Sequence, residues 1–228
     1  MAVDSRGDTV SPGDTPDPDG PHPPAGPRVV LATRNAHKVA ELNRILADAG
    51  FGGELVGLDE FPDAPDVAET GSTFADNALL KARAIAAYTG LPAVSDDSGL
   101  TVNALNGMPG ILSARWSGNH GDDRANLELV LGQLADIDNR GAAFVCVAAL
   151  ALADGSREWT TTGVLAGSIT RAPRGTNGFG YDPIFVPEGT ETTTAELAPQ
   201  DKDAISHRGR AFRAIASVIA GLSASQAR

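Results

Sequence analysis

The chain has 228 residues, of which 42% are hydrophobic, and a formal net charge of −11 at pH 7. This apolar content can bury one core of ordinary size, and the acidic balance disfavours a long nucleic acid as a partner, although a small anion needs only a local basic cluster. No apolar run reaches the roughly 18 residues of a membrane span, and the single Cys146 excludes an internal disulfide. We therefore expect no membrane span and a reducing, cytoplasmic location.

The first 27 residues differ in composition from the rest of the chain. They contain seven prolines and five aspartates and almost no large apolar side chain. Such a segment cannot bury enough apolar surface to fold, and it has neither the apolar stretch of a secretion signal nor the arginines of a transit peptide. The composition predicts a disordered tail over residues 1–27 and one folded domain over residues 28–228.

The folded part opens with a strand and a helix joined by a polar loop. Residues 28–34 are typical of a buried strand, and the apolar spacing over residues 35–49 predicts a helix. The loop between them offers hydroxyl, amide and cationic groups at a helix start, where free backbone amides attract phosphate. Its residues are Thr33, Arg34, Asn35, Ala36, His37 and Lys38. It lacks the glycines of a Walker loop, and the plainer alternative is a helix cap at Asn35 with Lys38 on the surface.

A second helix is predicted to begin with a capping box at Thr73 and to end at Gly90. Asn77 and Lys81 lie four residues apart and therefore on one face of this helix. Glu69 lies just ahead of the cap. It is either an ordinary loop acid or a metal ligand, and the second role requires the acids of the next segment to lie beside it.

Two adjacent carboxylates, Asp96 and Asp97, follow a short apolar run. With Ser98 and Gly99 they predict a turn at the end of a strand, opening into a cleft. Adjacent aspartates raise each other's proton affinity unless a divalent cation bridges them or one acts as a base near neutral pH. The pair is thus the candidate reaction centre, and the alternative is a solvated turn without a function.

The middle of the chain predicts mostly strands. Residues 100–105 predict a short strand, residues 122–134 an amphipathic helix, and residues 143–152 and 158–169 two long strands joined by a hairpin turn at residues 153–156. Strand–helix units together with a central hairpin indicate an α/β fold with a mixed sheet flanked by helices.

Two segments near the C-terminus carry further candidate residues. The glycine-rich stretch 175–183 can present the ring of Phe179 to a flat ligand, or else place that ring in the core. Ser206 can cap a helix with an apolar face, which puts His207 and Arg208 in the first turn. A cation is unfavourable at that end of the helix dipole unless it has an anionic or carbonyl partner.

Taken in order, five segments resemble the inosine triphosphate pyrophosphatase family, also called the Ham1-like family, over about residues 28–220. They are residues 33–38, 69–71, 95–99, 179–183 and 206–208. Family members often have glycine where this chain has Arg34, and a second acid where it has Ala68. The phosphate loop here is therefore stiffer and more basic, and Glu69 serves alone.

The resemblance implies an elongated α/β fold of two lobes with a central cleft, in which residues 28–228 form the catalytic domain, and a homodimer. It also implies Mg²⁺-dependent hydrolysis of ITP, dITP and XTP between the α- and β-phosphates. The products would be the nucleoside monophosphate and pyrophosphate, so that these nucleotides are removed from the pool.

The resemblance also assigns roles at the phosphates. Glu69 and Asp97 would hold Mg²⁺, and Asp97 would activate the attacking water, either as a general base or through the metal. Lys38, Lys81 and the loop at residues 33–38 would bind the triphosphate.

The remaining assignments concern the nucleoside. Ser98 would bind the nucleotide, and Phe179 would stack on the base. The base and sugar pocket would be completed by Gly180, Tyr181, Asp182, Lys202, His207 and Arg208. Donors such as His207 and Arg208 would satisfy a 6-oxo purine but leave the 6-amino group of adenine unpaired.

Two other functions fit the same residues. One is a house-cleaning pyrophosphatase of the septum-associated class, which acts on modified pyrimidine nucleotides. The aromatic loop and the His207–Arg208 pair disfavour this function. The other is a sensor that binds a triphosphate without hydrolysing it, which the combination of Asp97 with Glu69 disfavours.

Overall fold

The computed structural model describes residues 26–222, so the tail predicted over residues 1–27 lies almost wholly outside the described residues. Its centre is a six-stranded sheet in the order β2-β1-β3-β4-β5-β6. The strands are β1 (Arg28–Leu31), β2 (Glu54–Val56), β3 (Ala93–Val102), β4 (Gly141–Ala151), β5 (Glu158–Ile169) and β6 (Phe185–Pro187). β1 pairs in parallel with β2 and β3, and the other neighbours are antiparallel. The predicted α/β fold with a mixed sheet is confirmed.

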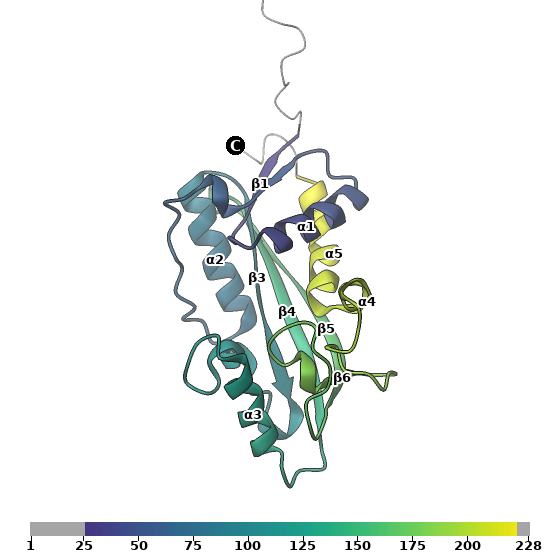
Figure 1. Ribbon diagram of the computed structural model, residues 1–228. Helices are drawn as coiled ribbons and strands as arrows, with labels where there is room; N and C mark the ends of the chain where they lie inside the picture. The colour runs from purple at the N-terminus through teal and green to yellow at the C-terminus, as the bar shows by residue number, and fades with distance from the viewer. Residues whose placement is uncertain (1–25, 223–228) are drawn as a thin grey trace, which may run out of the picture.

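Helices cover both faces of this sheet (Figure 1). α1 (Ala36–Asp48) and α5 (His207–Ala220) share a core with one face, and α2 (Phe74–Thr89) packs on the other. α3 (Asp123–Gln133) closes the far end of the long strands, and α4 (Pro199–Ile205) leads into α5. The short 3-10 helices are η1 (Leu58–Glu60), η2 (Asn103–Leu105), η3 (Gly110–Arg115) and η4 (Asp182–Ile184). Across residues 26–222, no helix is long and apolar enough to cross a membrane.

The helix ends follow the predicted capping chemistry. Thr73 forms the expected capping box at the start of α2, and Gly90 ends that helix in the left-handed conformation, with φ 71°. The Ser206 hydroxyl accepts a hydrogen bond from the amide of Gly209 at 2.9 Å and so caps α5. The predicted hairpin turn between the two long strands is also present, and Gly155 adopts φ 69° within it.

The prediction of a turn at Asp96 and Asp97 is wrong. β3 runs without a break from Ala93 to Val102 and pairs with β4 at each of its ten residues. The separate strand predicted over residues 100–105 is wrong as well, because its first half belongs to β3 and its second half is η2. Pairing along the whole length of β4 overrides the local turn preference of the Asp-Asp-Ser-Gly sequence.

One edge of β3 is open beside these aspartates. β1 pairs with β3 only at Ala93 and Val94, and from Ser95 to Leu100 no described strand pairs with that edge. The loop that follows β1 therefore lies beside the open edge. Ligands of open α/β sheets bind outside the carboxyl ends of the parallel strands, which makes this opening the natural place for a site.

Gly163→Ala is expected to lower the free energy of unfolding by about 1 to 3 kcal/mol. Gly163 lies in β5, and a Cβ there would collide with the backbone carbonyl of His207 and the backbone amide of Ala211 at the start of α5. Urea denaturation measures the loss. Gly132→Ala in α3 is the matched control, because a Cβ there meets nothing within 4 Å and alanine favours the helix. Equal stability of the two variants would contradict the argument.

Candidate active site

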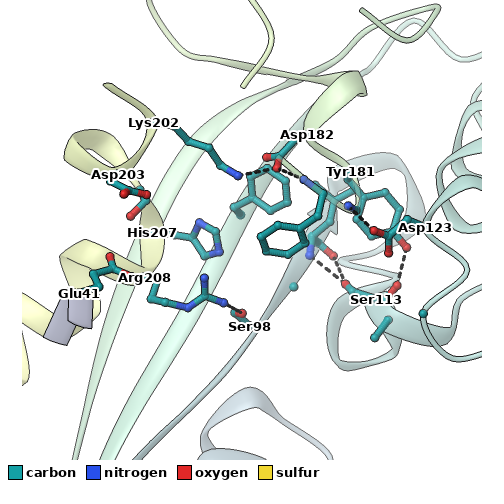
Figure 2. Close-up of a pocket in the computed structure, with 18 of the residues that line it drawn as sticks. Glu41, Ser98, Ser113, Asp123, Tyr181, Asp182, Lys202, Asp203, His207 and Arg208 are labelled. Carbon is teal, nitrogen blue, oxygen red and sulfur yellow. Dashed lines mark hydrogen bonds and ion pairs between the residues drawn. The ribbon is translucent and has the colours of Figure 1, made fainter. Parts of the chain in front are cut away.

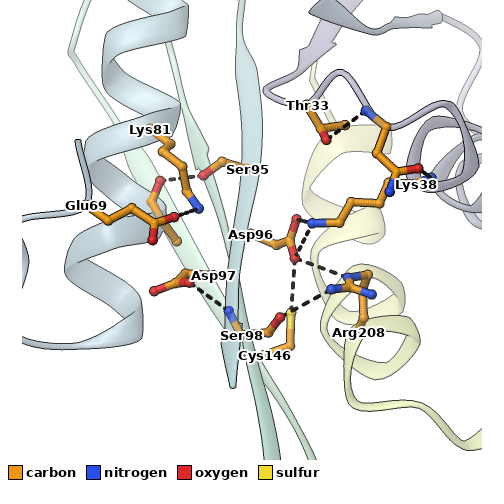
Figure 3. Close-up of polar contacts among 12 residues, drawn as sticks. Thr33, Lys38, Glu69, Lys81, Ser95, Asp96, Asp97, Ser98, Cys146 and Arg208 are labelled. Carbon is orange, nitrogen blue, oxygen red and sulfur yellow. Dashed lines mark hydrogen bonds and ion pairs between the residues drawn. The ribbon is translucent and has the colours of Figure 1, made fainter. Parts of the chain in front are cut away.

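Asp96 and Asp97 point to opposite faces of the sheet because successive side chains of a strand alternate. Asp96 points toward α1 and α5, where it meets Lys38 and Arg208 (Figure 3). Asp97 points toward α2, where it meets Asn77. The two acids are therefore not the mutually repelling pair that a turn would make.

Asp96 is a buried carboxylate held by two cations. Its side chain is 4% exposed, and it accepts hydrogen bonds from Lys38 Nζ at 2.8 and 3.1 Å and from Arg208 Nε at 3.2 Å. Burial alone would raise the pKa of Asp96, but Lys38 and Arg208 together hold that pKa well below its ordinary range. Asp96 therefore stays ionised and links the loop after β1 to the start of α5.

Asp97 has the opposite electrostatic character. Its Oδ2 accepts a hydrogen bond from Asn77 Nδ2 at 3.0 Å, and its Oδ1 accepts one from the Ser98 amide at 2.9 Å. Burial raises the pKa of Asp97 above its ordinary value, and the hydrogen bond from Asn77 and the charge of Lys81 offset only part of that rise. The raised pKa makes Asp97 the better proton acceptor of the two aspartates.

Glu69 lies on the same side of the sheet as Asp97. Its Oε1 is 2.5 Å from Lys81 Nζ, and its negative charge contributes to the raised pKa of Asp97. Among residues 26–222, no group of three or more His, Cys, Asp or Glu could hold a metal ion. Two oxygen donors suit Mg²⁺, which binds through one or two carboxylates and completes its shell with water and substrate phosphate. Glu69 and Asp97 therefore fit Mg²⁺ with a bound triphosphate.

The loop after β1 is held in shape by its own side chains. Thr33 Oγ1 accepts a hydrogen bond from the Asn35 amide at 3.2 Å, and Asn35 Oδ1 accepts one from the Lys38 amide at 3.4 Å. Lys38 is not a surface lysine, because its Nζ is engaged with Asp96. Ala36 is exposed at the start of α1, and the side chain of His37 lies outside the described part of the chain.

Arg34 binds backbone carbonyls of the segment between η1 and α2. Its guanidinium donates to the carbonyl oxygens of Pro62 and Ala64 at 3.3 and 3.2 Å. With Thr33 and Lys81 it lines a cavity of about 230 Å³. This cavity adjoins the loop after β1 on the side of α2, and Arg34 ties that loop to the segment that leads to Glu69.

A larger pocket of about 350 Å³ opens on the other side, between β3, the start of α5 and the loop around Phe179 (Figure 2). All eight residues predicted to bind the nucleoside line it. They are Ser98, Phe179, Gly180, Tyr181, Asp182, Lys202, His207 and Arg208.

Phe179 is presented to this pocket rather than placed in the core. The residue is 66% exposed, and Lys202 Nζ lies 4.9 Å from its ring centroid. Buried Asp182 holds the loop in place, since its carboxylate accepts hydrogen bonds from the Phe179 amide at 2.8 Å, from Lys202 at 2.5 Å and from the Thr194 hydroxyl at 2.8 Å. The Asp182 carboxylate is thus occupied by the protein, and it holds Phe179 and Lys202 in place.

The next two residues tie the same loop to the opposite wall of the pocket. The Gly180 amide donates to Asp123 Oδ2 at 2.7 Å, and the buried Tyr181 hydroxyl donates to the Ser113 carbonyl at 2.8 Å. Burial raises the pKa of Tyr181, so its hydroxyl stays protonated. These contacts hold the backbone of the Phe179 loop against that wall.

Neither His207 nor Arg208 places an unpaired positive charge at the start of α5. The His207 ring stacks on Phe144 with a centroid distance of 5.0 Å, and burial, together with the charges of Arg208 and Lys202, lowers its pKa to about 3. The imidazole is neutral at physiological pH and has one donor and one acceptor. Arg208 finds its anionic partner in Asp96 and also donates to Ser98 Oγ at 3.2 Å.

Sequence reasoning assigned no site role to several residues. Asn77 is fully buried against Asp97, and its helical spacing from Lys81 was a signal. Glu41 lines the larger pocket, and its spacing of three from Lys38 on a helix could have placed it there. Asp123 and Ser113 left no local signal, because only the folded chain brings them to the Phe179 loop.

The chain is similar to known proteins. Residues 29–218 match the Ham1 family. The chain is 62% identical over 194 residues to a dITP/XTP pyrophosphatase of Streptomyces avermitilis, covering 84% of this chain and 96% of the relative.

Two solved structures are also similar. A HAM1 protein from Coxiella burnetii is 45% identical, with a TM-score of 0.79 and coverage of 86% of this chain and 99% of the other. A nucleoside-triphosphatase described as a dITP/XTP pyrophosphatase from Mycobacterium abscessus is 56% identical, with a TM-score of 0.72 and coverage of 82% and 97%.

Proposed function

This chain belongs to the Ham1 family, and from that premise we propose that it is a dITP/XTP pyrophosphatase. It hydrolyses the non-canonical purine nucleotides ITP, dITP and XTP to the monophosphate and pyrophosphate, and so removes them from the nucleotide pool. The observation that carries this proposal is the adjacency of two sites: a pocket with an exposed aromatic ring lies beside an open strand edge that bears Asp96 and Asp97.

Two lysines bind the triphosphate, and in the free protein each of them pairs with a carboxylate. Lys38 engages Asp96 and Lys81 engages Glu69, so both ammonium groups lie beside the open strand edge. A nucleoside triphosphate carries close to four negative charges and attracts both. Hydroxyl and amide groups of the loop at residues 33–38 complete the binding of the phosphates.

Asp97 is the general base of the reaction. Its carboxylate takes a proton from the attacking water, whose oxygen bonds to the α-phosphorus. The bond from that phosphorus to the oxygen bridging the α- and β-phosphates breaks, and pyrophosphate leaves with the electron pair. The place of Asp97 on the open edge of β3, near Glu69 and Lys81, supports this role.

Mg²⁺ would be held by Glu69 and Asp97. When bound it would neutralise phosphate charge and stabilise the charge that develops on the leaving oxygen. Lys81 keeps the Glu69 carboxylate in position on the side of the sheet that faces α2.

The pocket selects a 6-oxo base through its donors. Phe179 stacks on the ring, while Arg208 and the single donor of neutral His207 face the substituents. Adenine would bring its 6-amino donor against the Arg208 guanidinium, which has donors and no acceptor. Each buried group left unpaired costs about 1 to 3 kcal/mol, which gives discrimination on the order of 10- to 100-fold.

We also propose that residues 28–228 form a single catalytic domain and that the protein is a homodimer in solution, as the family resemblance implies. Light scattering on the purified chain tests the assembly. A mass equal to that of one chain at the working concentration would contradict the dimer but not the proposed reaction.

A nucleotide panel tests the proposed reaction. Pyrophosphate release is measured from dITP, ITP, XTP, dATP and a modified pyrimidine deoxynucleoside triphosphate, each with and without Mg²⁺. We expect Mg²⁺-dependent release from the first three and much slower release from dATP. Tight binding without release would support a sensor, and a preference for modified pyrimidine triphosphates would support the septum-associated class.

A further inference from the structure

Asn77 is a fully buried polar residue in the first turns of α2, and both ends of its amide are used. Its Oδ1 accepts a hydrogen bond from the Gly71 amide at 2.8 Å, and its Nδ2 donates to Asp97 Oδ2 at 3.0 Å. The orientation of the amide follows from its partners, because a backbone N–H requires an acceptor and a carboxylate requires a donor. One side chain therefore joins Asp97 to the loop that carries Glu69.

This contact explains the glycine of the Glu69-Thr70-Gly71 segment. A Cβ at Gly71 would lie 2.8 Å from Asn77 Oδ1 and would collide with the Asp76 side chain. Only a residue without a side chain lets the loop approach α2 closely enough for the hydrogen bond to Asn77. The segment is thus shaped around this asparagine.

The same face of α2 holds the second carboxylate. Lys81 lies one turn beyond Asn77 and contacts Glu69. The helix itself is firmly seated, since Ala78 and Ala82 are fully buried and the Ser95 hydroxyl of β3 donates to the Ala78 carbonyl. α2 thus offers one donor to each carboxylate from a fixed support.

We propose that Asn77 is a positioning residue, which orients the Asp97 carboxylate for water activation and fixes it relative to Glu69. This inference rests on the proposed function. Without the Nδ2 donor, Asp97 would lose the only side-chain hydrogen bond that the described residues give it. Outer partners of ligating or catalytic groups typically contribute 10- to 100-fold to activity.

The test uses an isosteric variant. Asn77→Asp keeps an acceptor for the Gly71 amide but places an oxygen against Asp97 Oδ2. We expect kcat for dITP to fall roughly 10- to 100-fold. Calorimetry with the non-hydrolysable α,β-methylene analogue of dITP should give a Kd close to that of the wild type without Mg²⁺, and a smaller gain in affinity when Mg²⁺ is added. Asn77→Ala, which removes both hydrogen bonds, should show the same pattern and serves if the first variant fails to fold.

Asn126→Asp is the matched control. Asn126 is 1% exposed in α3 and also uses both ends of its amide, accepting from the Ser117 amide and donating to the Ala114 carbonyl. Its kcat should stay near that of the wild type. The inference is overturned if Asn77→Asp keeps its kcat, if the Mg²⁺-free Kd and kcat worsen together, or if the control loses as much kcat. Absence of pyrophosphate release by the wild type would instead refute the proposed function.

Discussion

Asp97→Asn is expected to lower the turnover of dITP by roughly 10²-fold or more, while nucleotide binding largely survives. The substitution keeps the shape of the side chain but removes its charge and its ability to take a proton. Binding survives because the phosphates are held by Lys38 and Lys81, and the base by the pocket around Phe179. Steady-state kinetics give kcat, and calorimetry with the α,β-methylene analogue gives Kd.

The effect of this variant on stability can be measured separately from its effect on turnover. Asp97 accepts from Asn77 at one oxygen and from the Ser98 amide at the other, whereas an asparagine can accept at only one end. One hydrogen bond is lost and a buried donor is left unpaired, which costs about 1 to 3 kcal/mol of stability and is visible as a decrease in Tm. Asp154→Asn in the hairpin turn, where the acid accepts from the Ser156 amide, is the control and should keep full turnover. Near-normal turnover of Asp97→Asn would show that another group is the base.

The elements predicted best from the sequence are those whose ends are set by local chemistry. The capping box at Thr73, the glycine at position 90 and the cap at Ser206 each involve residues within a few positions of one another. The folded structure keeps these helix caps because no distant residue competes for the groups that form them.

The arrangement around Asp96 and Asp97 could not be predicted in the same way. Their sequence favours a turn, but the partner that keeps them in a strand, β4, lies about fifty residues later in the chain. Once they lie in a strand, alternation sends one toward Lys38 and Arg208 and the other toward Asn77. The pKa of Asp96 is lowered and that of Asp97 is raised because of these different surroundings. The local sequence does not predict this difference.

The candidate site was likewise predicted only in part from the sequence. The phosphate-loop, Phe179 and α5 segments were found from local patterns, whereas the contacts among them were not. Arg208 was predicted to line the base and sugar pocket and to need an anionic or carbonyl partner, but the sequence did not identify that partner as Asp96, which Arg208 shares with Lys38. The base pocket and the phosphate loop are therefore joined through one buried charge.

Arg208→Ala is expected to narrow the ratio of catalytic efficiencies for ITP over ATP by about 1 to 3 kcal/mol, or on the order of 10- to 100-fold. Lys38→Ala should weaken both substrates alike, because Lys38 meets only phosphate. Each variant also leaves Asp96 with a single cation, and that cost falls equally on both nucleotides. Comparing ratios of kcat/KM removes the shared cost and leaves the contribution of base recognition.

The control is Arg210→Ala, on the same helix as Arg208. Arg210 is exposed and donates to the Val164 carbonyl at 2.6 Å, away from the pocket, so both efficiencies should stay near those of the wild type. Kinetics on ITP and ATP for all three variants give the comparison. An unchanged ratio for Arg208→Ala would assign base selection to other donors of the pocket. A changed ratio for Lys38→Ala would contradict the assignment of Lys38 to the phosphates alone.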